Sequence, residues 1–273
     1  MRARIGLSFL ALAGLVLIVG LACMSSTAQP TAVNPPATVP PATEPPTSEP
    51  LQFPTLPPAD TAEPVQIPTD TLEPAPVNES QQYFTQDFTQ ELSADWTQLL
   101  KGSGALHPDK LATSIKNGKM RMQIDTSDMY VYYFYTPYTY TDVRLDLQVE
   151  NIGVNSQNIS LVCRAGGDQW YEFSAGSDGI WYLYAYKKSS SRSYNVLAQA
   201  GAATLKQGHA TNTYGMSCIG DQIHLFVNDT ELPYSPVRML SYYFLEGQVG
   251  FNISSLESTP VIVDIDWFKV SQP

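Results

Sequence analysis

Residues 160–184 constrain the fold more than any other stretch, because three short segments of strand character follow one another with two turn signals between them. The strand-like segments are mainly apolar or aromatic, as residues in strands tend to be: Leu161–Arg164, Trp170–Ala175 and Ile180–Tyr186. The two segments between them contain glycine, which adopts positive φ without steric cost: Ala165–Asp168 and Ser177–Gly179. This pattern predicts three consecutive antiparallel strands joined by tight turns.

The remainder of the C-terminal part continues the same pattern of short strands. Thr141–Glu150 alternates strictly, with Val143, Leu145, Leu147 and Val149 on one face and polar or charged residues on the other. Further strands are expected at 83–88, 119–125, 129–140, 195–203, 213–219, 222–227, 247–253 and 261–270. Only Leu92–Leu100 has apolar residues at helical spacing, and one or two helical turns are expected there. The sequence therefore predicts an all-β, two-sheet antiparallel sandwich over residues 81–273.

The N-terminus has the features of an export signal. Arg2 and Arg4 precede an apolar run over Ile5–Ala22, which ends at Cys23. Gly20–Cys23 (GLAC) resembles the lipobox of bacterial lipoproteins, in which the signal is cut before a cysteine whose thiol is acylated; leucine is usual where Gly20 stands. The interpretation is a lipoprotein signal segment over 1–23 with Cys23 as the lipidation site. The alternative is an uncleaved anchor helix, since about 18 apolar residues just span a bilayer. Both place the rest of the chain outside the cytoplasm, anchored to the membrane of a bacterial cell surface or envelope.

Residues 24–80 form a linker of biased composition. Residues 25–80 hold 15 of the 21 prolines and seven acidic residues, but no Lys or Arg. Such a segment buries too little apolar surface to offset the entropy of ordering, so disorder is expected. At about 3.1 Å per residue in an extended polyproline conformation, it could reach on the order of 100 Å.

The charge balance argues against nucleic acid as a partner. The whole chain carries a formal charge of −11, and residues 81–273 hold 13 Lys and Arg against 19 Asp and Glu, a net charge of −6. Phosphate binding requires a concentrated positive surface, and no run of basic residues provides one.

The cysteines and the first predicted hairpin supply the candidate site residues. If Cys23 is lipidated, Cys163 and Cys218 remain in an oxidising compartment, where they either pair as a disulfide or stay as separate buried thiols. A turn at 166–168 places Cys163 across from Tyr171. It follows that Leu161, Cys163, Tyr171 and Phe173 face inward, and that Arg164, Trp170 and Glu172 share the outer face. These three are candidate ligand-binding residues for a sugar; the alternative is an ordinary surface cation–π or salt-bridge group.

Other features of the sequence are less informative about function. Met129–Tyr140 is rich in tyrosine and could be either a sugar-stacking platform or a strand at the edge of the core. The carboxylates of 141–150 and the Asp264–Asp266 pair fit solvated strand faces better than a glycosidase pair. His107, His209 and His224 lack metal-ligand spacing. No catalytic residues, metal site or cofactor are expected, because no nucleophile elbow, phosphate loop or dinucleotide motif is present.

A family resemblance rests on the order of several short motifs: Val162–Arg164, Trp170–Phe173, Asp178–Gly179, Gly208 with Asn212, Cys218–Gly220, Leu225–Asn228, Gly247–Gly250 and Ile265–Val270. This succession resembles the concanavalin A-like lectin/glucanase jelly rolls, which include laminin G-like domains. It resembles in particular the exported bacterial branch described as 3-keto-disaccharide hydrolase-like. The resemblance covers nearly all of residues 81–273. The chain lacks the Glu-x-Asp-x-x-Glu strand of the glucanase members.

The resemblance implies two antiparallel sheets with glycan bound on the concave one, and adjacent strands for Cys163 and Cys218, which favours their disulfide. The function expected is a membrane-anchored extracytoplasmic lipoprotein that presents a non-catalytic β-sandwich, which binds carbohydrate or an envelope glycan. The alternatives are a glycoside-processing hydrolase of the 3-keto-disaccharide type, or a passive adhesion or structural domain.

Overall fold

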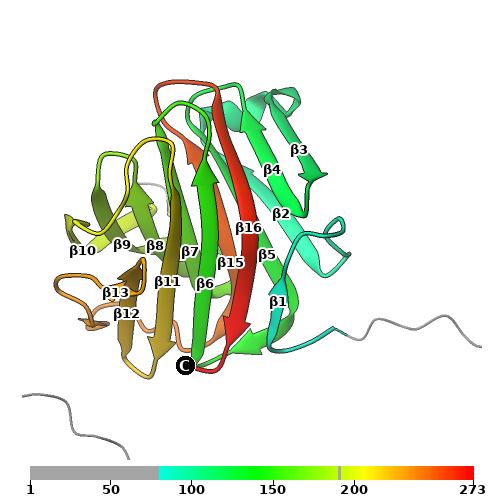
Figure 1. Cartoon of the computed structure of the whole chain (residues 1–273). Helices are drawn as coiled ribbons and strands as arrows, with labels where there is room; N and C mark the ends of the chain where they lie inside the picture. Colours follow the sequence, from blue (N-terminus) through cyan, green and yellow to red (C-terminus); the bar gives the residue numbers. More distant parts are fainter. Residues whose placement is uncertain (1–79, 190–191) are drawn as a thin grey trace, which may run out of the picture. The chain divides into compact units, whose positions relative to one another are not determined.

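The computed structural model describes residues 80–189 and 192–273. All of them belong to the second of the two units into which backbone contacts divide the chain, Thr71–Pro273. The predicted signal segment, the lipidation site Cys23 and the linker up to residue 79 lie outside the described residues. Two antiparallel sheets face each other in this unit (Figure 1).

The first sheet, which we call sheet A, has nine strands. Seven form a continuous path in the order β13-β12-β11-β6-β16-β4-β3, while β1 pairs with β16 and β14 pairs with β12. The strands are β1 (Phe84–Gln86), β3 (Leu111–Lys116), β4 (Lys119–Ile124), β6 (Val143–Asn151), β11 (Thr211–Ile219), β12 (Gln222–Val227), β13 (Thr230–Glu231), β14 (Val237–Arg238) and β16 (Val261–Ser271).

The second sheet, sheet B, has seven strands in the order β10-β9-β8-β7-β15-β5-β2. They are β2 (Trp96–Lys101), β5 (Met129–Tyr140), β7 (Gln157–Gly166), β8 (Gln169–Gly176), β9 (Ile180–Lys187), β10 (Tyr194–Gly201) and β15 (Gly247–Ser255). Two short 3-10 helices, η1 (Ser103–Leu106) and η2 (Pro108–Lys110), connect β2 with β3. Non-consecutive neighbours such as β7-β15-β5 and β11-β6-β16-β4 produce a jelly roll, so the predicted concanavalin A-like sandwich is confirmed.

The main core lies between the two sheets and follows from strand alternation. On β6 the alternating set Val143 to Val149 is buried, while the intervening polar residues are partly exposed. The three strands predicted over 160–186 are β7, β8 and β9, and Cys163 pairs directly with Tyr171 as expected. Cys163 and Cys218 form a disulfide that joins β7 in sheet B to β11 in sheet A, which confirms the predicted pairing.

Two predictions about secondary structure are wrong. The helical turns expected within Leu92–Leu100 do not form, because Trp96–Lys101 pairs with Tyr130–Tyr135 as an edge strand of sheet B. Tertiary pairing outweighs the helical spacing of three apolar residues. The second error is an omission, since β3 was not expected. Its burial pattern is irregular, as an edge strand allows.

The ladder between β5 and β15 is interrupted near Pro137. The pairing of β5 with β15 shifts register between Tyr135 and Tyr140, so the backbone around Pro137 leaves the ladder. Within the described part of the chain, no helix has the length and apolar character needed to cross a membrane.

Candidate functional site

The outer face of sheet B is strongly concave. The hydroxyl oxygens of Tyr132 on β5 and Tyr194 on β10 lie 2.7 Å apart, although four strands separate them in the sheet. Neighbouring strands are spaced by about 4.8 Å, so the same residues on a flat sheet would stand roughly 24 Å apart. Two tyrosine side chains cannot bridge that distance. The sheet must therefore curl around its outer face, which is the face expected to bind a ligand.

Aromatic side chains fill the middle of this concave face. We call this second buried group, separate from the main core, the concave cluster: Tyr132, Phe134, Val162, Ala165, Trp170 and Tyr186. The indole of Trp170 stacks on the ring of Tyr186 with centroids 3.8 Å apart. Lys101, on the far edge strand β2, lies over both rings, with Nζ 4.1 Å from the Tyr186 centroid and hydrogen-bonded to its hydroxyl. The protein's own side chains therefore fill much of the groove on this face.

Glu172 lies at the centre of the concave cluster and is 3% exposed. Its Oε2 accepts hydrogen bonds from the Tyr132 hydroxyl at 2.9 Å and from Trp170 Nε1 at 3.0 Å. Its Oε1 accepts one from Asn252 Nδ2 at 3.3 Å. All of these donors are neutral, so the carboxylate is solvated by the protein without a cation in hydrogen-bonding contact.

Burial has the largest effect on the pKa of the Glu172 carboxyl group. Removal from water raises the pKa of Glu172, while hydrogen bonds from Trp170, Tyr132, Ser160 and Asn252 oppose the rise. The carboxylate in turn adds to the burial that raises the pKa of Tyr132 and of Tyr194. These hydroxyls therefore remain protonated and act as donors at neutral pH.

Arg164 does not share this face, which corrects the prediction that it lies beside Trp170 and Glu172. The pairing of β7 with β8 shifts register between Cys163 and Gly166, so that two residues of β7 stand opposite one residue of β8. Arg164 has a φ of 53°, as a bulge residue can. The bulge places Ala165 in the concave cluster and sends Arg164 to the end of the sandwich. Alternation without the bulge predicts the wrong face.

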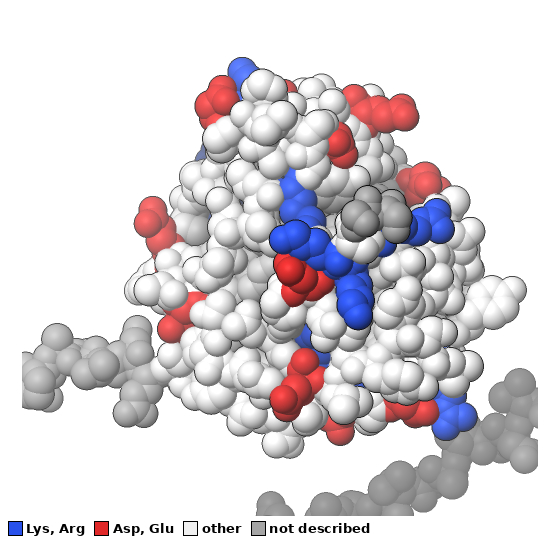
Figure 2. Space-filling view, turned by 180° about the vertical axis from the view of Figure 1, so that it is seen from behind, with Lys and Arg blue, Asp and Glu red and all other residues white. Residues whose placement is uncertain are grey.

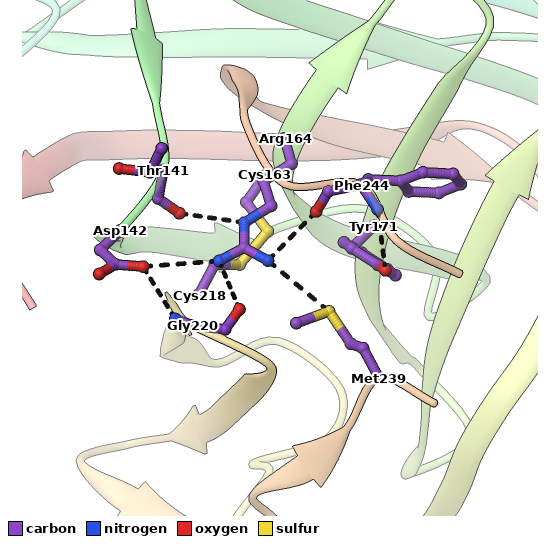
Figure 3. The surroundings of a disulfide bond; sticks show 9 residues. All are labelled: Thr141, Asp142, Cys163, Arg164, Tyr171, Cys218, Gly220, Met239 and Phe244. Carbon is purple, nitrogen blue, oxygen red and sulfur yellow. Dashed lines mark hydrogen bonds and ion pairs between the residues drawn. A yellow bond between two sulfur atoms is a disulfide. The ribbon is translucent and has the colours of Figure 1, made fainter. Parts of the chain in front are cut away.

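At this end Arg164 is 2% exposed and binds three separate backbone segments (Figure 3). Its Nε donates to the carbonyl of Thr141 at 3.0 Å, and its two terminal nitrogens donate to the carbonyls of Phe244 at 3.2 Å and Gly220 at 2.9 Å. Asp142 lies 3.6 Å from the guanidinium. Arg164 therefore ties together the β5–β6 turn, the β11–β12 turn and the segment before β15.

Trp170 and Glu172 do lie together, as predicted. Neither lies at the surface, although the sequence predicted that both would. Trp170 is 3% exposed, which leaves no ring face for a sugar. The partly exposed aromatic residues of the concave face are instead Tyr130, Tyr182, Tyr184 and Tyr194. The rings of Tyr182 and Tyr184 stack with centroids 5.5 Å apart, and Tyr184 contacts Tyr194 edge-on.

The groove stays open at the end near Tyr130. A hollow of about 450 Å³ there is lined by Asp128, Tyr130, Asn155, Ser156, Ser255, Leu256, Glu257 and Ser258. Its lining combines one aromatic ring with several polar groups. On the same side of the molecule, basic and acidic side chains gather near the middle of the view (Figure 2). One ion pair at the end of β9 joins Lys188 to Asp168 at 3.5 Å.

Other candidate catalytic groups do not converge. Asp264 is held by Arg121 through two bonds of 2.8 Å on sheet A. His224 and Ser235 both bind the same carboxylate oxygen of Glu231, so the serine is not activated by the histidine. Among residues 80–189 and 192–273, no group of three or more His, Cys, Asp and Glu side chains is arranged to hold a metal ion.

Two solved structures with TM-scores above 0.5 show the same fold at low sequence identity. A GH16 protein of a Bacteroides ovatus mixed-linkage glucan locus, in complex with a G4G4G3G product, is 10% identical with a TM-score of 0.52; the match covers 69% of this chain and 99% of that one. A family 16 endo-glucanase from Bacteroides ovatus is 11% identical with a TM-score of 0.51 and the same two coverages. The carbohydrate-binding module CBM66 from Bacillus subtilis is 12% identical over 63% of this chain and 92% of its own, with a TM-score of 0.45. No family model matches the sequence, and no curated protein matches it.

The sequence analysis did not single out Tyr182 and Tyr184, the stacked and partly exposed pair of this face. Tyr182 and Tyr184 follow each other at a spacing of two on β9, which is the signal that places them on one face with Tyr186. That signal was available, but the curl of sheet B that brings β5 and β10 together was not.

Proposed function

We propose that the protein is a membrane-tethered, extracytoplasmic module that binds carbohydrate on the concave face of sheet B without acting on it chemically. The observation that carries the proposal is the set of partly exposed tyrosines beside the filled part of the groove, above all the stacked pair Tyr182 and Tyr184. Stacked, half-buried rings offer flat apolar surfaces of the kind that sugar rings cover, and their hydroxyl groups supply hydrogen bonds.

The filled centre of the groove supports binding over catalysis. Glycoside hydrolysis uses two carboxyl groups about 5–10 Å apart with room for the substrate between them. The carboxylate of Glu172 is instead enclosed by Trp170, Tyr132 and Asn252, all of which hydrogen-bond to it. A substrate could reach Glu172 only after the concave cluster had opened. The matching glucanase structures contribute the fold to this argument and not the activity.

The membrane tether belongs to the same proposal and is supported by the sequence alone. The apolar run Ile5–Ala22 followed by Cys23 would attach the chain, and the proline-rich segment would hold the sandwich away from the surface. A binding module in this position would collect glycans at the cell envelope.

The test is a glycan array with the detergent-solubilised full chain, followed by titration of the best ligand. We expect selective binding, and we expect Tyr182→Ala and Tyr184→Ala each to weaken it by about tenfold, because each removes roughly 1–2 kcal/mol of aromatic contact. Tyr234→Ala is the matched control, since this tyrosine is 78% exposed and lies between β13 and β14 at the edge of sheet A, not on the concave face of sheet B. Equal binding by all three variants would refute the proposed site, and no selective binding on the array would refute the function.

A further inference from the structure

Three exposed apolar side chains lie close together in the segment between β14 and β15. Leu240, Tyr243 and Leu245 are 71%, 74% and 68% exposed, respectively. The hydroxyl of Tyr243 donates to the carbonyl of Leu240, so these two residues are in contact. Among the described large apolar residues, only Leu106 on η1 and Tyr234 between β13 and β14 are as open to solvent. We call Leu240, Tyr243 and Leu245 the apolar tip. Apolar residues gathered in this way mark interaction surfaces more often than chance exposure.

The segment that carries the apolar tip is anchored on both sides of each exposed residue. Met239 and Phe244 are each 5% exposed and pack into the main core. The hydroxyl of Tyr171 donates to the carbonyl of Tyr242. Arg164 donates to the carbonyl of Phe244 (Figure 3). The exposed side chains therefore project from a fixed backbone, which lowers the entropy lost when they bind.

The described chain begins at the same end of the sandwich. The hydroxyl of Tyr138 binds the carbonyl of Ser80, and the hydroxyl of Tyr140 binds the carbonyl of Gln82. Tyr140 also pairs with Gly247, two residues after Leu245. Seventy-nine residues precede Ser80, and their sequence predicts membrane attachment. The strand ends that receive the tether thus adjoin the apolar tip.

We propose that the apolar tip inserts into the headgroup and upper acyl region of the lipid bilayer to which the N-terminus tethers the chain. Leucine side chains would enter the acyl region, and tyrosine is suited to the interface, where its ring is apolar and its hydroxyl is wet. Charge does not oppose this insertion strongly. Residues 233–246 contain only Arg238 and Glu246, and Arg238 is bonded to Asp221 at 2.6 Å.

A bilayer fits this surface better than a protein partner does. A stable protein interface uses about 20–30 residues on each side, whereas the apolar tip has three. Such a small surface binds weakly by itself. A tether that keeps it near the bilayer raises its effective concentration, so that weak insertion becomes sufficient. The sandwich would then rest on the membrane by the end where the tether enters.

The experiment uses the full chain reconstituted into phosphatidylcholine vesicles that contain either ordinary or brominated acyl chains. A Tyr243→Trp variant reports insertion, because bromine quenches tryptophan only at close range. A Leu106→Trp variant is the matched control, since Leu106 is 80% exposed but lies outside the apolar tip. The unsubstituted chain, which has four tryptophans, supplies the background to subtract.

We expect the added emission of Tyr243→Trp to be blue-shifted and strongly quenched by brominated lipid, and that of Leu106→Trp to be unchanged. Adding Leu240→Ser and Leu245→Ser to the Tyr243→Trp variant should remove most of the quenching. Moderate salt should not reduce the quenching, because the contact with lipid is apolar and not ionic. If the chain binds to vesicles but brominated lipid does not quench the added emission of Tyr243→Trp, insertion is refuted and the membrane tether is not. Failure of the chain to associate with vesicles would refute both. Neither result bears on glycan binding, which the array measures separately.

Discussion

Arg164 and Glu172 are two buried charges on neighbouring strands that the protein accommodates in opposite ways. Arg164 lies at the end of the sandwich and donates to carbonyls of three loop segments, with Asp142 nearby. Glu172 lies in the middle of the concave face and accepts from side chains of regular strands. The charge of Arg164 holds together loop segments that are not paired as strands. The charge of Glu172 lies on a sheet face whose strands are already held together by their backbone ladders.

This difference predicts unequal consequences when each charge is removed. Loss of a buried cation leaves its carbonyl partners without donors, and each unsatisfied buried group costs about 1–3 kcal/mol. Loss of a buried carboxylate leaves neutral donors unpaired but also removes the cost of holding a charge away from water. We therefore expect the Arg164 end to depend on its charge, and the concave cluster to depend mainly on packing.

The largest effect should come from Arg164→Ala. We expect a loss of about 3–5 kcal/mol in the free energy of unfolding, because the variant leaves the buried carbonyls of Thr141, Gly220 and Phe244 without this hydrogen-bond donor. Denaturant unfolding of the full chain measures this loss, and hydrogen exchange should show faster exchange in 239–246. Arg121→Ala is the control, since its ion pair with Asp264 is partly exposed and should be worth about 1 kcal/mol or less. Equal losses for both variants would show that burial of Arg164 confers no special role.

A smaller, pH-dependent effect should follow from Glu172→Gln. Because burial raises the pKa of Glu172 in the folded state, the folded protein binds this proton more tightly than the unfolded chain. The stability of the wild type should then fall as pH rises from the ordinary glutamate pKa through the raised one. The Gln variant has no such proton, so its stability relative to wild type should increase between about pH 4 and 8, as the wild-type carboxyl loses its proton.

Unfolding measured across that pH range distinguishes this outcome from simple loss of packing. A Glu172→Gln variant that is less stable by the same amount at every pH would contradict the raised pKa.

The sequence predicted the architecture well because strand alternation and glycine turns are local signals. The pairing of Cys163 with Tyr171 and the buried face of β6 both follow from counting residues. The site was predicted less well for two physical reasons. A single bulge reversed the side of Arg164, and the same count that places Trp170 on a strand face does not show how far the sheet curls. Curvature is a property of the whole sheet, and it turned a predicted surface tryptophan into a buried one.

The smallest expected effect concerns Lys101, whose ammonium group covers the stacked rings of Trp170 and Tyr186. Lys101→Met keeps the length and apolar stem of the side chain but removes the charge. A cation–π contact at a partly exposed site contributes about 0.5–1 kcal/mol, so the variant should lose no more than that in stability. Its main consequence should be for access: without the ammonium group, Tyr186 should become more accessible, which tyrosine-selective nitration followed by peptide mass spectrometry can measure. If Tyr186 is modified at the wild-type rate, the concave cluster is closed by its own packing and not by Lys101, and the comparison with the charge-dependent Arg164 end becomes sharper.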